Sequence, residues 1–425
     1  MKELKVILIG AGNRGKMYVR KMAKKGGFKI VGVAEPIDDR RNFVKETYGI
    51  PEENCYTTWE DILARPKFAD IAIVSTSDAL HYEPAMKAIG LGYNLLLEKP
   101  AAPTPEQCAD LANLAKEKGV KVLVCHVLRY TVFWSKIKKL IDEGAIGQVV
   151  SVQHEECVGN EHHSHSYVRG NWGNTAKSSN MLLAKSCHDI DLIQWLVGSK
   201  CKSAASFGSL TYFKRENAPE GAPEYCIEGC PHADTCFYNA VKIYSKGRGW
   251  LGHAVQKPEI TPADIEEVLR TTQYGKCVFK CDNDVVDHQV VNLEFENGAT
   301  ASFNMCSFNK GGRRMKIMGT EGEIWGAHGD NKLYLYSFKT KETTEIRPSD
   351  EATVESIAGG HGGGDDGIVN ALYDYVANGV EDGNLSEIGI SVENHLITFA
   401  AEQARLDHCV IDFKDYAGKY LKTRS

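Results

Sequence analysis

The chain has 425 residues, which is too long for one ordinary hydrophobic core and suits two domains. With 43% hydrophobic residues, 25% charged residues and a net charge of −6, it has the composition of a globular protein and no electrostatic attraction for nucleic acid or anionic membranes. No apolar run approaches the length of a membrane span, and the apolar start is too short for a signal-peptide core. We therefore expect a cytoplasmic protein whose thirteen cysteines are mostly reduced thiols.

The opening stretch predicts a strand, a glycine-rich turn, a helix and a second strand. The apolar run 4–9 is typical of a buried parallel strand, 16–24 of a helix, and 28–34 of a second buried strand that is followed by Glu35. The turn at 10–15 has the pattern GxGxxG. Because the strand, the helix and the acid are all in place, this order is the fingerprint of a dinucleotide-binding fold.

Each glycine of the turn has a task in such a fold. Gly10 permits the tight turn, Gly12 lets the backbone approach a pyrophosphate, and Gly15 lets the helix pack closely on the strand. The phosphates would rest on the N–H groups at the start of the helix. The predicted phosphate site therefore comprises Gly10, Gly12, Asn13, Arg14 and Gly15.

The acid decides between the two nicotinamide coenzymes. Glu35 lies twenty residues after Gly15, where a carboxylate can accept hydrogen bonds from the adenosine ribose. It would also repel a 2′-phosphate, so NAD is favoured over NADP. Arg40 and Arg41 stand nearby and leave room for NADP.

Strands and helices continue to alternate as far as residue 125, which predicts a doubly wound parallel sheet. Ligands bind such sheets outside the carboxyl ends of the strands. The side chains that follow predicted strands are Thr76, His81, Glu98 and Lys99, and we expect them to line the cofactor site. The predicted elements are helices at 39–48, 59–63, 83–91 and 105–118, and strands at 69–75, 93–97 and 120–125.

The pattern changes after residue 126. Alternating apolar segments joined by turns predict a large, mostly antiparallel sheet, so the expected division is a Rossmann domain at 1–126 and a second α/β domain at 127–425. The predicted strands are 149–154, 285–296, 299–308, 314–318, 323–326 and 332–337, and the predicted helices 133–143, 182–197, 368–378 and 388–405.

Two side chains are candidates for proton transfer. Lys99 lies between Glu98 and Pro100 at a strand end, where partial desolvation can lower the pKa of an ammonium group. His188 and Asp191 are three residues apart and share a helix face, so the carboxylate can orient the imidazole of a general base. The alternatives are a surface lysine and a buried structural histidine, and spacing alone does not separate the two interpretations of His188.

These motifs resemble the Gfo/Idh/MocA oxidoreductases, the family of glucose–fructose oxidoreductase and inositol dehydrogenase. The resemblance implies a Rossmann domain, an α/β domain whose open sheet forms an oligomer interface, and NAD(P)-dependent hydride transfer at a sugar or cyclitol. It also implies that Lys99 and His188 act on the substrate hydroxyl. The residues that carry it are Gly10 to Gly15, Thr76 with His81, Glu98-Lys99-Pro100, and His188 with Asp191.

The sequence departs from the family pattern beside His188. Many members have an aspartate four residues before this histidine, where the chain has Ala184, and a glycine two before it, where it has Ser186. Lys185 stands beside the gap. Either Lys185 contacts the substrate, or Asp189 or Asp191 supplies the missing carboxylate.

A loop rich in histidine and aromatic residues predicts the substrate-binding wall. Aromatic rings stack on sugar faces, while arginine and histidine bind hydroxyls or a carboxylate. As a metal site the loop is a weak candidate, because its histidines lack helical ligand spacing. Arg129 and Tyr130, which follow the last Rossmann strand, could also reach the substrate. The loop candidates are His162, His163, His165, Tyr167, Arg169 and Trp172.

A cysteine cluster lies further along the chain. Cys226, Cys230 and Cys236 with Cys277 or Cys281 could make a closed tetrahedral zinc site. The spacings are not those of a standard CxxC pair, and the alternative is a set of reduced thiols.

The resulting expectation is an NAD-dependent oxidoreductase that acts on a secondary alcohol of a sugar, sugar acid or cyclitol, as a homodimer or homotetramer. One alternative is a redox-neutral enzyme that cleaves, eliminates or epimerises through a transient keto sugar. Another is a non-catalytic NAD-binding regulator, in which Lys99 and His188 are structural.

Overall fold

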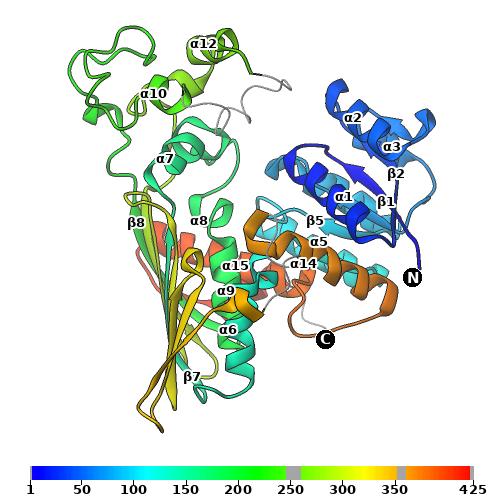
Figure 1. The fold of residues 1–425 in the computed structure, drawn as a ribbon, viewed down its shortest axis with the longest axis vertical. Helices are drawn as coiled ribbons and strands as arrows, with labels where there is room; N and C mark the ends of the chain where they lie inside the picture. Colours follow the sequence, from blue (N-terminus) through cyan, green and yellow to red (C-terminus); the bar gives the residue numbers. More distant parts are fainter. Residues whose placement is uncertain (1, 246–259, 352–359, 422–425) are drawn as a thin grey trace.

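Two β-sheets organise the chain, one built by its first third and one by the remainder (Figure 1). The computed structural model describes residues 2–245, 260–351 and 360–421. The first sheet has six strands in the order β3-β2-β1-β4-β5-β6, and every pairing in it is parallel. Its strands are β1 Leu4–Ile9, β2 Phe28–Ala34, β3 Cys55–Tyr56, β4 Ile71–Val74, β5 Asn94–Leu97 and β6 Val122–Val124.

Helices connect these strands and cover both faces of the sheet, so the predicted doubly wound Rossmann fold is confirmed. The strands are buried on both faces, which explains their continuous apolar sequences. The short strand β3 was not predicted. The helices are α1 Asn13–Lys25, α2 Asp38–Tyr48, α3 Trp59–Ala64, α4 Tyr82–Gly90 and α5 Pro105–Lys118.

The second sheet has nine strands in the order β14-β13-β12-β11-β7-β10-β9-β8-β15. The β7–β10 pair is parallel and the other pairs are antiparallel, which confirms the prediction of a mostly antiparallel sheet. The strands β8, β14 and β15 were not predicted. The strands are β7 Val149–Cys157, β8 Cys201–Ser209, β9 His288–Phe295, β10 Thr300–Cys306, β11 Gly312–Gly319, β12 Gly322–Ala327, β13 Lys332–Ser337, β14 Thr343–Ile346 and β15 Ile411–Asp412.

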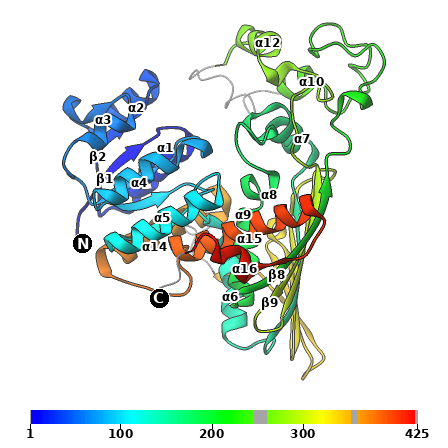
Figure 2. The ribbon, with the colours of Figure 1, turned by 180° about the vertical axis from the view of Figure 1, so that it is seen from behind.

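Helices lie between this sheet and the Rossmann part (Figures 1 and 2). The predicted helix 182–197 is two helices, because the backbone leaves helical geometry at Ser186, with φ −99° and ψ 7°. The helices of this part are α6 Val132–Asp142, α7 Asn160–His163, α8 Met181–Ala184, α9 Cys187–Val197, α10 Ala240–Tyr244, α12 Pro262–Thr271, α14 Gly364–Tyr373, α15 Ile388–Asp407 and α16 Phe413–Gly418.

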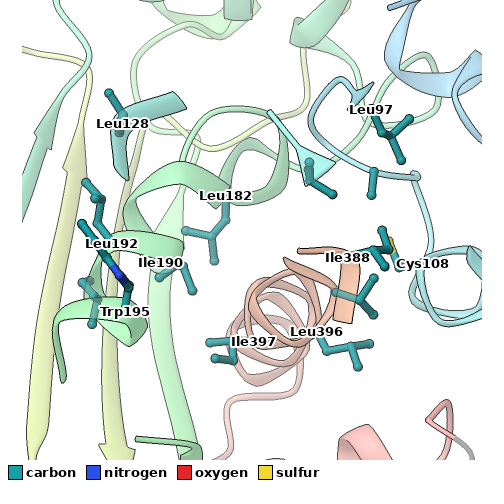
Figure 3. Packing of buried hydrophobic residues seen from close by; sticks show 14 of the residues in the cluster. Leu97, Cys108, Leu128, Leu182, Ile190, Leu192, Trp195, Ile388, Leu396 and Ile397 are labelled. Atoms are coloured by element: carbon teal, nitrogen blue, oxygen red, sulfur yellow. The ribbon is translucent and has the colours of Figure 1, made fainter. Parts of the chain in front are cut away.

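Helix α15 joins the two parts. Ile388, Leu396 and Ile397 of this helix belong to one buried cluster with Cys108 of α5 and Ile190 of α9 (Figure 3). The apolar core is therefore continuous between the two parts, which fixes how the ends of the Rossmann strands face the second sheet. No helix of the described ranges is long and apolar enough to cross a membrane.

Helix α14 packs against the Rossmann part although it comes late in the chain. Ile368 and Leu372 are fully buried in the cluster that contains Leu4 and Val6 of β1. The Tyr373 hydroxyl donates to the Lys2 carbonyl at 2.8 Å. The division into domains between residues 126 and 127 stays a prediction. Helix α14, from late in the chain, completes the hydrophobic core of the Rossmann part.

An insertion separates β8 from β9, which are neighbours in the sheet. Residues 210–287 leave the end of β8 and carry α10 and α12 before the chain returns at β9 (Figure 1). The only element predicted in this range is the start of the strand 285–296, and the structure begins that strand at His288. The insertion holds the cysteine cluster.

Candidate active site

The glycine-rich turn between β1 and α1 has the geometry of a phosphate cradle. Gly10 has φ +89°, and a Cβ there would lie 2.7 Å from the Ser75 carbonyl oxygen. A Cβ on Gly15 would lie 2.2 Å from the Gly10 carbonyl oxygen, whereas a Cβ on Gly12 would meet nothing within 4 Å. Gly12 is also the N-cap of α1 and offers no side-chain acceptor. The turn is thus tight against the sheet and open on its outer side, so the residues present fit a pyrophosphate.

Glu35 is held beside this turn. Its carboxylate accepts the Ala11 N–H at 2.6 Å and the Ile37 N–H at 3.1 Å, and the residue is 4% exposed. The Glu35 carboxylate therefore holds the turn in place, in addition to its predicted role in binding the adenosine ribose. Arg40 lies near Lys16, and its positive charge helps to lower the pKa of that ammonium group, after the larger effect of burial.

Arg14, which belongs to the turn, makes a partly buried ion pair. Its Nε donates to Glu98 Oε1 at 2.6 Å, and its Nη2 donates to Asp365 Oδ1 of α14 at 2.9 Å. Glu98 also accepts the Tyr18 hydroxyl at 2.7 Å. Burial alone would raise the pKa of Glu98, but the charge and hydrogen bond of Arg14, with smaller contributions from Lys99 and Tyr18, together hold that pKa below its usual value. Arg14 and Glu98 thus join the turn to the end of β5.

His81 secures the loop after β4 rather than facing outward. Its Nδ1 lies 2.7 Å from the Pro100 carbonyl oxygen and its Nε2 lies 3.2 Å from the Thr76 carbonyl oxygen. Thr76 donates its hydroxyl to the Leu80 carbonyl at 2.9 Å. The structure places His81 as a buried brace that positions the backbone of Thr76 and Lys99.

Lys99 reaches from β5 across to the second part of the chain. Its Nζ donates to the Ala184 carbonyl at 2.9 Å, at the end of α8 and four residues before His188. Lys99 therefore reaches the segment that leads into the helix carrying His188, in the other half of the molecule. The carbonyl holds the ammonium group without neutralising it.

His188 lies against a second histidine that the sequence analysis did not single out. The ring centroids of His126 and His188 are 5.5 Å apart, and the rings meet edge to face at 82°. His126 is fully buried, and burial lowers its pKa to about 4. Within the described part of the chain, neither ring nitrogen of His126 has a hydrogen-bond partner. A neutral imidazole therefore lies directly behind the candidate base.

Lys185 has a carboxylate neighbour that the sequence analysis missed. Its Nζ lies 3.4 Å from Glu156 Oε1 on β7, and Glu156 Oε2 lies 2.5 Å from Nη2 of Arg313 on β11. Glu156 and Arg313 are directly paired across the two strands. Burial lowers the pKa of Lys185, and Glu156 opposes that shift. The sequence signal that could have predicted this pair is a charged residue at an inward-facing position of each strand, Glu156 on β7 and Arg313 on β11.

Asp189 does not fill the family's missing carboxylate. Its Oδ1 lies 2.7 Å from His154 Nε2 and 2.7 Å from Arg313 Nε, and the side chain is fully buried. Burial favours the neutral acid, but Arg313 and His154 hold the pKa of Asp189 well below its usual range. The acid thus anchors α9 to β7 and β11.

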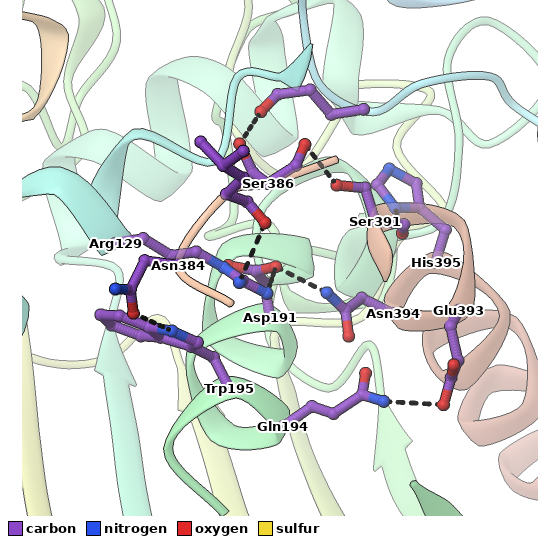
Figure 4. Close-up of polar contacts among 12 residues, drawn as sticks. Arg129, Asp191, Gln194, Trp195, Asn384, Ser386, Ser391, Glu393, Asn394 and His395 are labelled. Carbon is purple, nitrogen blue, oxygen red and sulfur yellow. Dashed lines mark hydrogen bonds and ion pairs between the residues drawn. The ribbon is translucent and has the colours of Figure 1, made fainter. Parts of the chain in front are cut away.

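The Asp191 carboxylate is bound by other side chains, so it does not orient His188 as predicted. The same contact keeps Arg129 from binding a substrate, which was its predicted role. The two Asp191 oxygens accept Nε and Nη2 of Arg129 at 2.7 Å each, and Asn394 donates to Oδ1 at 2.5 Å (Figure 4). Arg129 is 2% exposed, so it is closed to a substrate. Tyr130 is similarly engaged, with its hydroxyl 3.0 Å from Ser386 Oγ. These residues stabilise the contact between α9 and α15.

The loop predicted as the substrate wall is helical, with α7 running into a π-helix at Ser164–Arg169. His163 and Arg169 are fully buried, which corrects their predicted contact with substrate. His163 Nδ1 lies 2.6 Å from Ser307 Oγ, and burial lowers its pKa to about 3. His165 Nδ1 lies 2.7 Å from the Tyr244 hydroxyl in the insertion. These side chains hold the loop rather than line its open side.

Trp172 remains as the exposed part of the wall. It is 38% exposed, and its indole Nε1 donates to Asp78 Oδ2 of the Rossmann part at 2.7 Å. Tyr167 is 4% exposed, which corrects its predicted contact with substrate, and its centroid lies 6.1 Å from that of Trp172 and 5.9 Å from that of His162. Trp172, with Tyr167 packed beside it, therefore joins the two parts of the chain next to the loop that follows β4.

Two models of one family match the chain. An oxidoreductase family model for an NAD-binding Rossmann fold matches residues 4–126, and its C-terminal alpha/beta domain model matches residues 138–393. The chain belongs to the Gfo/Idh/MocA oxidoreductase family. It is therefore an oxidoreductase with an NAD-binding Rossmann fold, as the glycine-rich turn predicts.

The proteins similar to this chain include one named an oxidoreductase, one named a hydratase and a solved dehydrogenase. The protein YteT of Bacillus subtilis (strain 168) is 26% identical over 324 residues, 74% of each chain. A 2,7-anhydro-N-acetylneuraminate hydratase of Escherichia coli (strain K12) is 29% identical over 201 residues, 47% of this chain and 51% of its own. A solved levoglucosan dehydrogenase in complex with NADH and levoglucosan has the same fold, with TM-score 0.71 and 19% identity over 97% of this chain and 100% of its own.

The cysteine cluster lies away from this Gfo/Idh/MocA site, in the insertion. All thirteen cysteines are free thiols. Cys226, Cys230, Cys236 and Cys277 line one small cavity. In the described ranges, no three His, Cys, Asp or Glu side chains are already arranged to hold a metal ion, so the predicted zinc site is not confirmed.

Proposed function

We propose that the chain transfers hydride between NAD and a secondary alcohol of a carbohydrate-type substrate, a sugar, sugar acid or cyclitol. The observation that carries this proposal is the contact between Lys99 and the Ala184 carbonyl, at 2.9 Å. It brings an ammonium group from the end of β5 to the start of the helix that carries His188. Both lie where a Rossmann sheet presents its ligand, at the carboxyl ends of the strands.

The cofactor-binding residues fit NAD. Gly12 and the N-terminus of α1 would hold the pyrophosphate, and the free lone pairs of Glu35 would accept the ribose hydroxyls. When bound, NAD supplies the hydride acceptor or donor. The backbone of Thr76, braced by His81, would line the opposite side.

The chain's own task is then to hold and move the hydroxyl proton. His188 would accept this proton as general base, while the Lys99 ammonium stabilises the negative charge that develops on the oxygen. His126, neutral and buried, packs edge to face against His188 and places no charge beside it. Lys185, paired with Glu156, would bind a second oxygen of the substrate.

A second candidate function is redox-neutral chemistry at the same site. A relative that shares 29% identity is named a hydratase, and a hydratase consumes no net oxidant. The chain also carries Ala184 and Lys185 where the family resemblance implies an acid. In this version the keto sugar is transient. A substituent at the neighbouring carbon is eliminated or cleaved, or that carbon is epimerised, before the keto group is reduced again.

Both candidates are tested by one screen. Sugars, sugar acids, cyclitols and glycosides are incubated with NAD, and NADH absorbance and product mass are followed in parallel. NADH formation in step with substrate loss supports the dehydrogenase. Product formation at substoichiometric NAD without NADH supports the redox-neutral candidate.

Variants connect the activity to the site. Lys99→Met and His188→Asn should each lower kcat by about 10²–10⁴ while NADH binding, followed by fluorescence, is retained. The matched control Lys139→Met removes an ammonium group whose side chain is 61% exposed. Full activity in both site variants would contradict the proposal and favour a binding role.

We also propose that the chain forms a homodimer or homotetramer through the outer face of its nine-stranded sheet. Phe207 of β8 and Val290 of β9 are paired across the strands and are 60% and 36% exposed, and Val150 of β7 is 49% exposed. Light scattering on the intact chain tests this, and Phe207→Asp should lower the mass. A monomer at all concentrations would contradict it.

A further inference from the structure

Two cysteines of the insertion are held side by side by paired backbone. An isolated antiparallel bridge joins Tyr225 to Lys276. The Cys226 N–H donates to the Gly275 carbonyl and the Cys277 N–H donates to the Glu224 carbonyl, both at 2.9 Å. Residues far apart in the sequence thus bring two thiols to one place.

Two further cysteines come from a tight turn over the same place. The Ala233 N–H donates to the Cys230 carbonyl at 3.1 Å, and the Cys236 N–H donates to the His232 carbonyl at 2.9 Å. The four thiols line one cavity, in which about 20 Å³ is open to the centre of a water-sized sphere. That is room for a single small species.

A buried cation lies next to these thiols. The Arg169 guanidinium is fully buried, and its Nη2 donates to the Tyr238 carbonyl at 2.6 Å and lies 4.0 Å from Cys226 Sγ. Nη1 makes no hydrogen bond of normal geometry, and the Tyr244 hydroxyl is its polar neighbour. No carboxylate in the described ranges pairs with Arg169. A buried cation without a counter-charge is costly.

We propose that Cys226, Cys230, Cys236 and Cys277 bind one zinc ion. Four thiolates select a soft cation, and four thiolate ligands make a closed, structural site. Binding releases the four thiol protons, so Zn²⁺ with four thiolates carries a net charge of −2. Arg169 supplies the missing counter-charge, and its Nη2 lies 4.0 Å from Cys226 Sγ.

Two other side chains lie near the four thiols. Cys281 turns its Sγ to the Cys277 carbonyl at 3.4 Å and does not line the cavity, so it is excluded as a ligand. His232 lines the cavity, and the 2.8 Å contact of its Nε2 with the Glu220 carbonyl oxygen leaves Nδ1 as an alternative ligand, which His232→Gln would test by loss of the metal. The four thiols themselves are not yet at ligand spacing, so the ion must draw them inward across a cavity of about its own size by rotation of the cysteine side chains.

The proposed site would fix the wall of the candidate active site. Arg169 ends the π-helix that contains His165 and Tyr167. Its Nε donates to the Lys276 carbonyl at 2.8 Å, on the bridge that carries Cys277. Zinc would therefore tie the insertion to the segment that presents Tyr167, without touching a substrate.

Metal content of the intact chain tests the proposal without any activity assay. The protein is expressed with added zinc, dialysed without chelator, and analysed by elemental mass spectrometry. We expect one zinc per chain, retained in Cys409→Ser, whose cysteine is exposed and elsewhere. Cys236→Ser should lose the metal and keep NADH binding, since the glycine-rich turn is unchanged.

A second measurement covers the case in which Cys236→Ser does not fold. In the wild-type chain, a thiol reagent should find four more reactive thiols after the zinc is removed by a chelator. Cobalt added to the metal-free protein should produce the charge-transfer bands of a four-thiolate site. A metal-free protein with reduced thiols, a disulfide among these four cysteines, or bound iron would each overturn the proposal.

Discussion

Arg14 Nε and Glu98 Oε1 are 2.6 Å apart, so a partly buried ion pair connects the glycine-rich turn to the strand end that carries Lys99. Glu98→Gln removes the charge and leaves Arg14 with Asp365. Because a buried charged hydrogen bond is lost, we expect the free energy of unfolding to fall by about 1.5–3 kcal/mol. Urea unfolding at neutral pH measures this, with Glu117→Gln, an exposed pair with Lys118, as the control. Equal stability of the two variants would contradict the role given to the pair.

The Arg129–Asp191 pair predicts a larger loss. Arg129→Met leaves the Asp191 carboxylate buried with only Asn394, which should cost about 3–5 kcal/mol. The surface pair Arg270–Glu266 is the control, and Arg270→Met should cost about 0.5 kcal/mol or less. Thermal and urea unfolding measure both. A small loss at Arg129 would mean that water reaches Asp191 and that the residue is open to ligands after all.

Acid should destabilise the fold through its buried histidines. Burial lowers the pKa of His126 from 6.5 to about 4, and those of His163 and His395 to about 3. As the pH falls below about 6.5, the unfolded chain gains protons that the native chain does not bind, so stability decreases. At pH 5 each histidine should contribute a loss of up to about 2 kcal/mol relative to pH 7.

His126 offers a direct test of this pH dependence, because neither of its ring nitrogens has a described partner to lose. His126→Phe should reduce the difference in unfolding free energy between pH 7 and pH 5 by up to about 2 kcal/mol. His408→Asn, at an exposed left-handed helix cap, should leave that difference unchanged. An unaltered pH dependence in His126→Phe would show that this imidazole is already protonated or hydrated.

Glu35 should control both affinity and coenzyme choice. Glu35→Ser removes the acceptor of the Ala11 N–H and the charge that repels a 2′-phosphate. NADH binding should weaken by about tenfold, the loss of one charged hydrogen bond. NADPH binding should improve, because Lys16 and Arg40 lose a nearby carboxylate. Fluorescence titration measures both, with exposed Glu53→Ser as the control. Unchanged selectivity would place the ribose elsewhere.

The fold of the Rossmann part could be predicted from the sequence because its motifs lie close together along the chain. The GxGxxG turn, the apolar parallel strands and the acid at 35 lie within one short stretch, and each has its physical reason nearby. Strand ends and motif resemblance also single out Lys99 and His188, whose catalytic roles stay predictions. The contact of Lys99 with the Ala184 carbonyl joins segments that are distant in the sequence, which spacing does not predict.

The partners of charged side chains could not be predicted. Spacing placed Asp191 beside His188, but Arg129 and Asn394, remote in sequence, take its carboxylate. Glu156 and Arg313 face each other only because β7 and β11 are neighbours in the sheet. The π-helix at 164–169 was read as a loop, since its polar side chains are buried by the insertion rather than by a local apolar face.

Helix α14 has a consequence for exchanging parts between members of this family. Residues 364–373 complete the Rossmann core from a position late in the chain, and Lys21 pairs with Asp366 there at 2.6 Å. A hybrid enzyme cut at residue 126 would carry a foreign helix against its coenzyme half. A hybrid that exchanges helix α14 together with the Rossmann part keeps their interface matched. The segments that must be exchanged together are therefore not contiguous in the gene.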